Sequence, residues 1–306
     1  MRIAVMAAGA VGGYFGARLA AAGNDVVFFA RGAHLDAIRT KGLRVDSARG
    51  NFEVKDATAT DTAEGLAPVE VVIFAVKLWD NERAAQIIKP IVGPDTRVVT
   101  TQNGIDTFDM IEPILGRGRV VPGLAQISVT IAAPGVISHV SPYHLIAFNH
   151  SDRRADPVLN AFVAAGKAAG VDFALSDNID RDLWTKFTIL VAISSLTAAS
   201  RLPLGATRGD PDGRKLMMTL MREVVAVGRA RGAPLPEDHA DKVMPFIEGV
   251  PDATKASMAH DLDRGNRLEL DWLAGRVVSL GRELGVPTPA CETIYAILKP
   301  YRMGTH

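Results

Sequence analysis

The stretch VMAAGAVGGYFG, residues 5–16, decides how the first half of this chain is interpreted. Dinucleotide-binding domains pass from their first strand into a helix through a G-x-G-x-x-G turn. Gly9 and Gly12 stand at its second and third glycine positions, where they would admit a pyrophosphate and allow close helix–sheet packing. Alanine replaces the first glycine, which costs little if its φ is negative. The turn residues predicted to bind a nucleotide are Ala7, Gly9, Ala10, Val11 and Gly12.

Short apolar segments alternate with helical patterns around this turn. This alternation is typical of βαβ units and predicts a doubly wound parallel sheet of the Rossmann type. Strands are expected at 2–6, 25–30, 69–76 and 97–102, and helices at 11–22, 32–40, 80–89 and 106–115. Later strands with a hairpin within 119–148, a helix at 155–169 and the strand VDFAL at 171–175 would complete this domain.

The pattern becomes entirely helical after about residue 176. Breakers such as RLPLG and LGVPTP separate the helical segments, which we place at 180–200, 211–232, 237–248, 256–285 and 288–300. We therefore expect a nucleotide-binding domain over residues 1–175 and an all-helical substrate and catalytic domain over residues 176–306.

Composition excludes several classes of protein. The 306 residues include 34 Lys plus Arg and 34 Asp plus Glu, and this neutral balance argues against electrostatic binding of nucleic acid. Cys291 is the single cysteine, so neither an internal disulfide nor a cysteine-based zinc site can form, and we expect a buried, inert thiol. No cluster of His, Cys and Asp has metal-ligand spacing, so no metal is expected.

The chain begins with an apolar strand rather than a signal peptide. Its longest apolar runs, such as FTILVAISSLTAAS, are judged too short to cross a membrane. These features predict a cytoplasmic protein whose partner is a small molecule. The oligomeric state is not encoded in any readable pattern, and a homodimer is our working expectation.

Two cations follow the second and third predicted strands. NAD sites place a carboxylate at the end of the second strand, but here FFARG presents Arg31. A guanidinium there can bind a 2′-phosphate bidentately, and Lys77 in FAVKLWD can reach the same group. Either cation alone would be read as an ordinary surface charge. Together, at what we take to be neighbouring strand ends, they favour NADP over NAD.

The ordered set of motifs resembles the ketopantoate reductase family. It comprises GAVGGYFGARLA, the AR and VK dipeptides, QNG at 102–104, DLWTKF, LTA and SMAHDLDRGNRLELD. Each piece is weak by itself, but the set covers the whole chain in order. The resemblance implies reduction of 2-dehydropantoate by NADPH, a step toward pantothenate and coenzyme A.

The resemblance also implies roles for particular residues. Lys186 matches the catalytic lysine that gives a proton to the carbonyl oxygen, and Asn103 matches an asparagine between nicotinamide and substrate. Glu269 matches a glutamate that contacts substrate hydroxyl and cofactor, and Ser257 matches the serine that binds the substrate carboxylate. Taken alone, Lys186 and Glu269 would be interpreted as surface charges, and Ser257 as a helix cap.

The chain departs from the family on the helix that follows the lysine. Lys186, Leu190 and Ser194 share one helical face, and the family has asparagines where Leu190 and Ser194 stand. A third family asparagine aligns with Leu204. An apolar wall favours apolar substituents, so the substrate can be a 2-oxo acid with a more apolar tail than ketopantoate. A non-catalytic NADP-binding sensor is a further alternative, although a sensor does not need the lysine.

Overall fold

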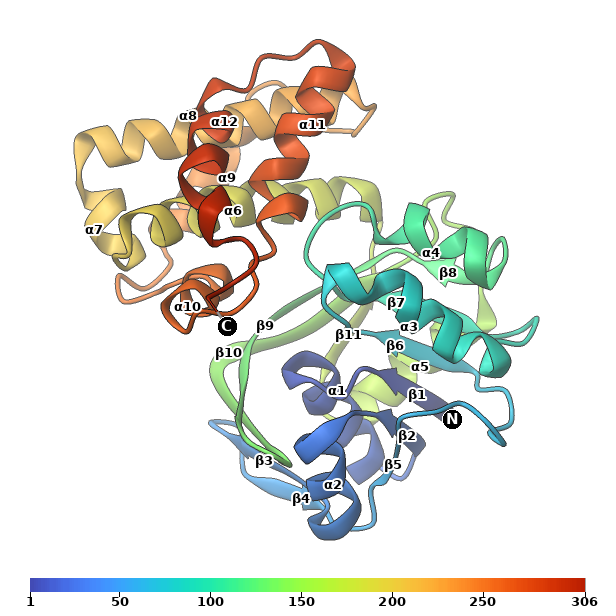
Figure 1. Cartoon of the computed structure of the whole chain (residues 1–306). Coiled ribbons are helices and arrows are strands. Elements are labelled where there is room, and N and C mark those ends of the chain that lie inside the picture. The colour runs from blue at the N-terminus through green and yellow to red at the C-terminus, as the bar shows by residue number, and fades with distance from the viewer. Residues whose placement is uncertain (306) are drawn as a thin grey trace. The chain divides into compact units, whose positions relative to one another are not determined.

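The computed structural model describes residues 1–305 and has two compact units, Met1–Ile179 and Asp180–His306. The first unit is built on two sheets and the second is helical, as predicted. Figure 1 shows the elements of both units along the chain.

A six-stranded parallel sheet forms the frame of the first unit, in the order β5-β2-β1-β6-β7-β8. Helices pack on both of its faces (Figure 1). The Rossmann-type, doubly wound sheet is therefore confirmed. Its strands are β1 (Arg2–Met6), β2 (Asp25–Phe29), β5 (Thr58–Thr60), β6 (Val71–Phe74), β7 (Arg97–Thr100) and β8 (Val120–Val121), and its helices are α1 (Ala10–Ala21), α2 (Gly32–Lys41), η1 (Leu78–Asp80), α3 (Asn81–Ile88), η2 (Lys89–Ile91) and α4 (Thr107–Leu115).

Alternation along each strand divides the apolar residues of this sheet between two cores. Ile3 and Val5 of β1 pack into the core that contains α1, whereas Ala4 and Met6 pack into the core that contains α3 and α4. All four side chains are at least nine-tenths buried. A strand that is apolar at every position is the sequence signature of a sheet covered on both faces.

A second sheet, in the order β11-β10-β3-β4 with β9 also paired to β10, covers the other side of α1. The hairpin expected within 119–148 belongs to this sheet, and β3, β4 and β5 were not predicted. Those three strands are only three to five residues long and partly exposed, so their apolar periodicity is weak. The elements are β3 (Leu43–Ser47), β4 (Phe52–Val54), β9 (Gly123–Ala133), β10 (Val136–Phe148), α5 (Pro157–Ala168) and β11 (Asp172–Leu175).

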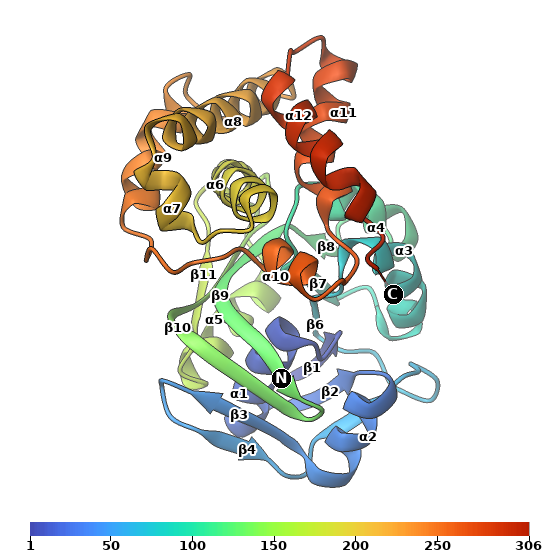
Figure 2. The same ribbon diagram turned by 60° about the vertical axis from the view of Figure 1, so that its left-hand side comes forward.

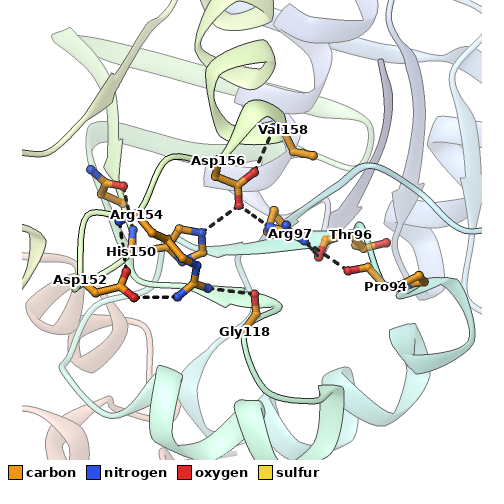
Figure 3. A network of polar contacts seen from close by, with 10 residues as sticks. Pro94, Thr96, Arg97, Gly118, His150, Asp152, Arg154, Asp156 and Val158 are labelled. Carbon is orange, nitrogen blue, oxygen red and sulfur yellow. Dashed lines mark hydrogen bonds and ion pairs between the residues drawn. The ribbon is translucent and has the colours of Figure 1, made fainter.

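A buried carboxylate ties the first sheet to α5 (Figure 3). Asp156 accepts hydrogen bonds from Arg97 Nε of β7, from His150 Nε2 at 2.8 Å, and from the N–H of Val158 at 3.0 Å. Burial by itself would raise the pKa of Asp156, but the hydrogen bonds from His150 and Arg97 outweigh it and lower the pKa. The carboxylate therefore caps α5 and holds it to the strand.

The helical unit contains α6 (Ile179–Ser200), α7 (Leu204–Gly209), α8 (Pro211–Ala230), α9 (His239–Glu248), α10 (Ser257–Asp263), η3 (Leu270–Trp272), α11 (Ala274–Leu284), α12 (Pro289–Leu298) and η4 (Lys299–Tyr301). Figure 2 shows α8 and α9 beside α6. The single helix expected over 256–285 is wrong, because the chain leaves α10 through Gly265, whose φ of 70° ends the helix. The short α7 lies where only a breaker was expected.

Helix α6 contradicts the expectation that the apolar runs of this chain are too short to cross a membrane. Its 22 residues are long and apolar enough to cross a membrane by length and composition, and 61% of its most apolar window is buried inside the protein. A core helix passes the same test, and burial of this kind is what a core helix shows.

Glu223 of α8 accepts hydrogen bonds from the backbone N–H groups of Ala290 and Cys291, both at 2.8 Å. The carboxylate thus caps α12 from another helix, where the helix dipole favours negative charge. Cys291 is buried, as expected, and burial, helped by Glu223, raises the pKa of its thiol.

Candidate active site

The glycine turn lies at the carboxyl end of β1 and opens α1. Gly9 is the residue that precedes the helix, and a Cβ built on it meets nothing within 4 Å. A Cβ on Gly12 would lie 2.1 Å from the carbonyl oxygen of Ala7 and 2.8 Å from Cγ1 of Val5. Gly9 thus leaves space beside the free N–H groups of the helix, whereas Gly12 permits contact between helix and strand. The φ of Ala7 is negative, as expected.

His34 contacts the backbone of this turn, a role that the sequence did not indicate. Its Nε2 lies 2.8 Å from the carbonyl oxygen of Ala8, and its Nδ1 accepts a hydrogen bond from Gly135 N at 3.1 Å. Because Nδ1 accepts, Nε2 must carry the proton and donate to Ala8. Burial lowers the pKa of His34, against the opposing effect of the bond to Ala8. A neutral imidazole therefore connects the turn to the β9–β10 hairpin.

The two predicted cations follow β2 and β6. We took these strands for neighbours, and that is wrong, because β1 lies between them. Arg31 is largely exposed and forms an ion pair with Asp80, with 3.1 Å between Nη2 and Oδ2. The Nζ of Lys77 lies 5.6 Å from the centre of the Trp79 ring. The ion pair thus connects the segments after β2 and β6 across the end of β1. Asp80, like His34, was not identified from the sequence.

Asn103 follows β7 on the same edge of the sheet, just before Gly104, whose φ is 93°. The preceding residue, Gln102, donates from its Nε2 to Oδ1 of Asn81, a completely buried side chain at the start of α3. This bond holds the loop that carries Asn103 against α3. Asp80 and Asn81 are successive residues at the start of α3. Asp80 pairs with Arg31 in the loop after β2, and Asn81 accepts a hydrogen bond from Gln102 in the loop after β7.

Lys186 lies on α6 within the helical unit, and Glu269, just before η3, is its charged neighbour. Burial lowers the pKa of Lys186 to about 8, and the Glu269 carboxylate acts in the opposite direction. Glu269 itself is buried, with 4% of its surface exposed. An ammonium with this pKa is protonated at neutral pH and still gives up its proton readily.

Leu190 and Ser194 lie one and two turns along α6 from the lysine. Leu190 is partly exposed, whereas Ser194 is 1% exposed and its hydroxyl has no hydrogen-bond partner among the described residues. Leu204 is completely buried, and its N–H donates to the carbonyl oxygen of Thr254 at 2.8 Å. Leu204 is thus part of the core of the helical unit.

Ser257 is the first residue of α10 and is exposed. The residue preceding the helix is Ala256, so the reading of Ser257 as its cap is wrong. The N–H of Ala256 donates to Oγ1 of Thr197 at 3.4 Å, which attaches the start of α10 to α6. The helix that carries Lys186 therefore also supports Ser257.

A Rossmann-type sheet with a glycine turn is typical of dinucleotide-dependent oxidoreductases, and the helical unit adds a lysine with a glutamate as its charged neighbour. Residues 3–152 match the model of the family described as ketopantoate reductase PanE/ApbA, and residues 178–302 match the model of its C-terminal part. The chain belongs to the ketopantoate reductase family.

Relatives in sequence cover nearly the whole chain. It is 31% identical over 322 residues to the 2-dehydropantoate 2-reductase of Mesorhizobium japonicum, covering 98% of this chain and 97% of that protein. It is 27% identical over 303 residues to an uncharacterized oxidoreductase, YkpB, of Bacillus subtilis, covering 98% and 99%. The relatives in sequence thus include proteins with and without an assigned substrate.

Solved structures agree with this assignment. The PanE/ApbA family ketopantoate reductase of Ralstonia eutropha matches with a TM-score of 0.88 at 32% identity, covering 99% of this chain and 98% of that one. D-mandelate dehydrogenase, solved with NADH and anilino(oxo)acetate, matches with a TM-score of 0.90 at 21% identity, covering 99% and 98%. The second likeness shows a shared fold.

Proposed function

We propose that this protein reduces a 2-oxo acid to the 2-hydroxy acid with NADPH, and that Lys186 gives the proton to the carbonyl oxygen. The observation that carries the proposal is the charge pair in the helical unit, in which Lys186 of α6 has the buried Glu269 as its neighbour; burial lowers the pKa of this lysine to about 8. Proton donors work best when their pKa lies near the working pH. A surface lysine would not have this property.

The residues of the first unit fit a dinucleotide. The open space at Gly9 suits a pyrophosphate on the free N–H groups of α1, and Arg31 and Lys77 supply cations for a 2′-phosphate. Asn103, at the end of β7, is proposed to lie between nicotinamide and substrate, and Glu269 is proposed to contact the cofactor. When bound, the reduced nicotinamide supplies the hydride that the carbonyl carbon receives.

The side chains of the helical unit do the remaining chemistry. The Lys186 ammonium stabilises the negative charge that develops on the carbonyl oxygen and then transfers its proton to that oxygen. Solvent returns a proton to the neutral amine. Glu269 keeps the lysine charged before the reaction, and Ser257 is proposed to bind the substrate carboxylate. Electrons and protons balance, since the carbonyl gains one hydride and one proton.

The family points to 2-dehydropantoate as the substrate, and hence to pantothenate and coenzyme A synthesis. A cytoplasmic location and a homodimer remain the expectations drawn from the sequence. Leu190 favours a second candidate, a paralogous reductase for a 2-oxo acid with a more apolar tail. A partly exposed leucine one turn from the lysine offers no hydrogen bond to a substrate hydroxyl.

A panel of 2-oxo acids assayed by NADPH oxidation, with NADH in parallel, tests both candidates. A preference for ketopantoate supports the first, and a preference for a branched apolar 2-oxo acid supports the second. NADPH binding without turnover of any of them would identify the third reading, an NADP-binding sensor.

A further inference from the structure

Arg31 and Asp80 combine, in one ion pair, the two side-chain types that separate NADP sites from NAD sites. In NAD sites a carboxylate at the end of the second strand binds the ribose 2′-hydroxyl, and in NADP sites an arginine accommodates the 2′-phosphate. In this chain Arg31 follows the second strand, β2, and the carboxylate of Asp80 comes from the segment after β6. Here Nη2 of Arg31 and Oδ2 of Asp80 are 3.1 Å apart. Any group bound by the guanidinium therefore lies close to the carboxylate as well.

The two members of the pair differ in how firmly they are held. The Arg31 side chain is 75% exposed, whereas that of Asp80 is 25% exposed. Asp80 immediately precedes α3, and its own N–H donates to the carbonyl oxygen of Lys77 at 2.9 Å. The next residue, Asn81, is completely buried and hydrogen-bonded to Gln102. The carboxylate is thus the fixed member, and the guanidinium is the member with room to move.

We propose that Asp80 is a specificity-determining residue that sets the balance between NADPH and NADH, an inference that rests on the proposed function. With NADPH, Arg31 is shared between the 2′-phosphate and Asp80, whose negative charge opposes the phosphate. With NADH, the carboxylate of Asp80 accepts a hydrogen bond from the ribose 2′-hydroxyl, and Arg31 stays paired with it. The wild-type site therefore binds both dinucleotides, with a smaller preference for NADPH than Arg31 alone would produce.

Asp80→Asn removes the charge and keeps the shape. Binding of the 2′-phosphate should strengthen about fivefold, because an exposed opposing charge is worth up to about 1 kcal/mol. Binding of the ribose hydroxyl should weaken by a similar factor, because an amide is a poorer acceptor than a carboxylate. The NADPH-to-NADH affinity ratio should therefore rise by about 25-fold, the product of the two factors. Asp80→Glu keeps the charge and should stay near wild type.

The experiment measures the dissociation constants of 2′,5′-ADP and 5′-AMP, and of NADPH and NADH, by calorimetry on the full-length protein. The matched control is Asp25→Asn, because Asp25 pairs with Arg2 at 3.4 Å at the opposite, amino-terminal ends of β1 and β2. A rise in the 2′,5′-ADP to 5′-AMP affinity ratio in Asp80→Asn, and not in Asp25→Asn, is the expected result.

An unchanged ratio in Asp80→Asn, while the wild-type protein binds NADPH, overturns the role of Asp80 and leaves the proposed function standing. A wild-type protein that binds neither dinucleotide overturns the proposed function itself, and the inference with it. Equal changes in Asp80→Asn and Asp25→Asn also overturn the inference, because they would reflect net charge alone.

Discussion

The Glu269 carboxylate raises the pKa of the Lys186 ammonium, but burial lowers it more strongly, to about 8. The two effects act on the same proton in opposite directions. Their balance keeps the lysine charged near neutral pH and leaves it acidic enough to serve as a proton donor.

The pH dependence of reduction follows from this balance. The donor must be protonated, so kcat/KM should be constant below about pH 8 and fall above it. Glu269→Gln removes the effect that raises the pKa, so the fall should begin at lower pH. Glu283→Gln, which changes an exposed glutamate of α11, is the control. A profile that Glu269→Gln does not shift would contradict the pairing.

Removal of the lysine amine should separate chemistry from binding. Lys186→Ala should lower kcat by about 10² to 10⁴, the usual contribution of a positioned acid. The dissociation constant of NADPH, measured by fluorescence titration, should change little, because the glycine turn belongs to the other unit. Unchanged turnover would mean that another group supplies the proton.

The two glycines of the turn should respond differently to alanine. Gly9→Ala should fold like the wild type, since its Cβ meets no atom within 4 Å, but should bind NADPH weakly. Gly12→Ala should lose about 3 kcal/mol of stability, because its Cβ would lie 2.1 Å from the backbone oxygen of Ala7. Thermal melts with NADPH titrations distinguish the two, and equal melting temperatures would contradict the prediction.

Substrate preference should depend on the residue one turn from the lysine. Leu190→Asn places an amide where the resemblance to the family implies one and should raise kcat/KM for ketopantoate relative to an apolar branched 2-oxo acid about tenfold. Leu202→Asn makes the same change at an exposed leucine beyond the end of α6 and should leave the ratio unchanged. A ratio that Leu190→Asn leaves unaltered would remove this side chain from the substrate site.

The buried network around Asp156 in Figure 3 should make the free energy of unfolding depend on pH. Asp156→Asn leaves Arg97 and His150 without their carboxylate and should cost about 3 kcal/mol at pH 7. The folded-state pKa of Asp156 lies below the ordinary 3.8, so its stabilising effect is present above that pH and is lost as the pH falls through the lowered value. Urea unfolding of both proteins at pH 7 and in acid measures this difference, which should narrow in acid.

Long, strongly patterned elements could be predicted from the sequence, and short ones could not. The strands around β1, β2, β6 and β7 were placed within a few residues because short apolar runs rich in Val, Ile and Phe, bounded by turn residues, favour buried strands. The strands β3 to β5 carry polar, half-exposed residues whose pairing depends on distant partners, such as Val136–His139 of β10 for β3. The break at Gly265 was missed although polar residues flank it directly, because apolar residues recur further out on each side, at Leu262 and Leu268.

Some residues of the candidate site could likewise be proposed from the sequence, and others could not. The glycine turn and the cations at strand ends could be proposed from the sequence because they adjoin their strands. His34 and Asp80 were not, since each acts through a partner 26 or 49 residues away. Asp80 stands three residues after Lys77 in the quoted motif FAVKLWD, but only the strand order shows that it meets Arg31.

The divided pairing of β10 has a consequence for synthesis of the chain. Its first half pairs with β3 and its second half with β11, which ends at Leu175. Phe15, on the helix of the glycine turn, lies with its ring centre 5.7 Å from that of Phe173. A ribosome releases Phe15 long before Phe173, so the first helix emerges with one apolar side uncovered. The helix of the glycine turn is therefore synthesised before β11, the strand whose Phe173 covers its Phe15.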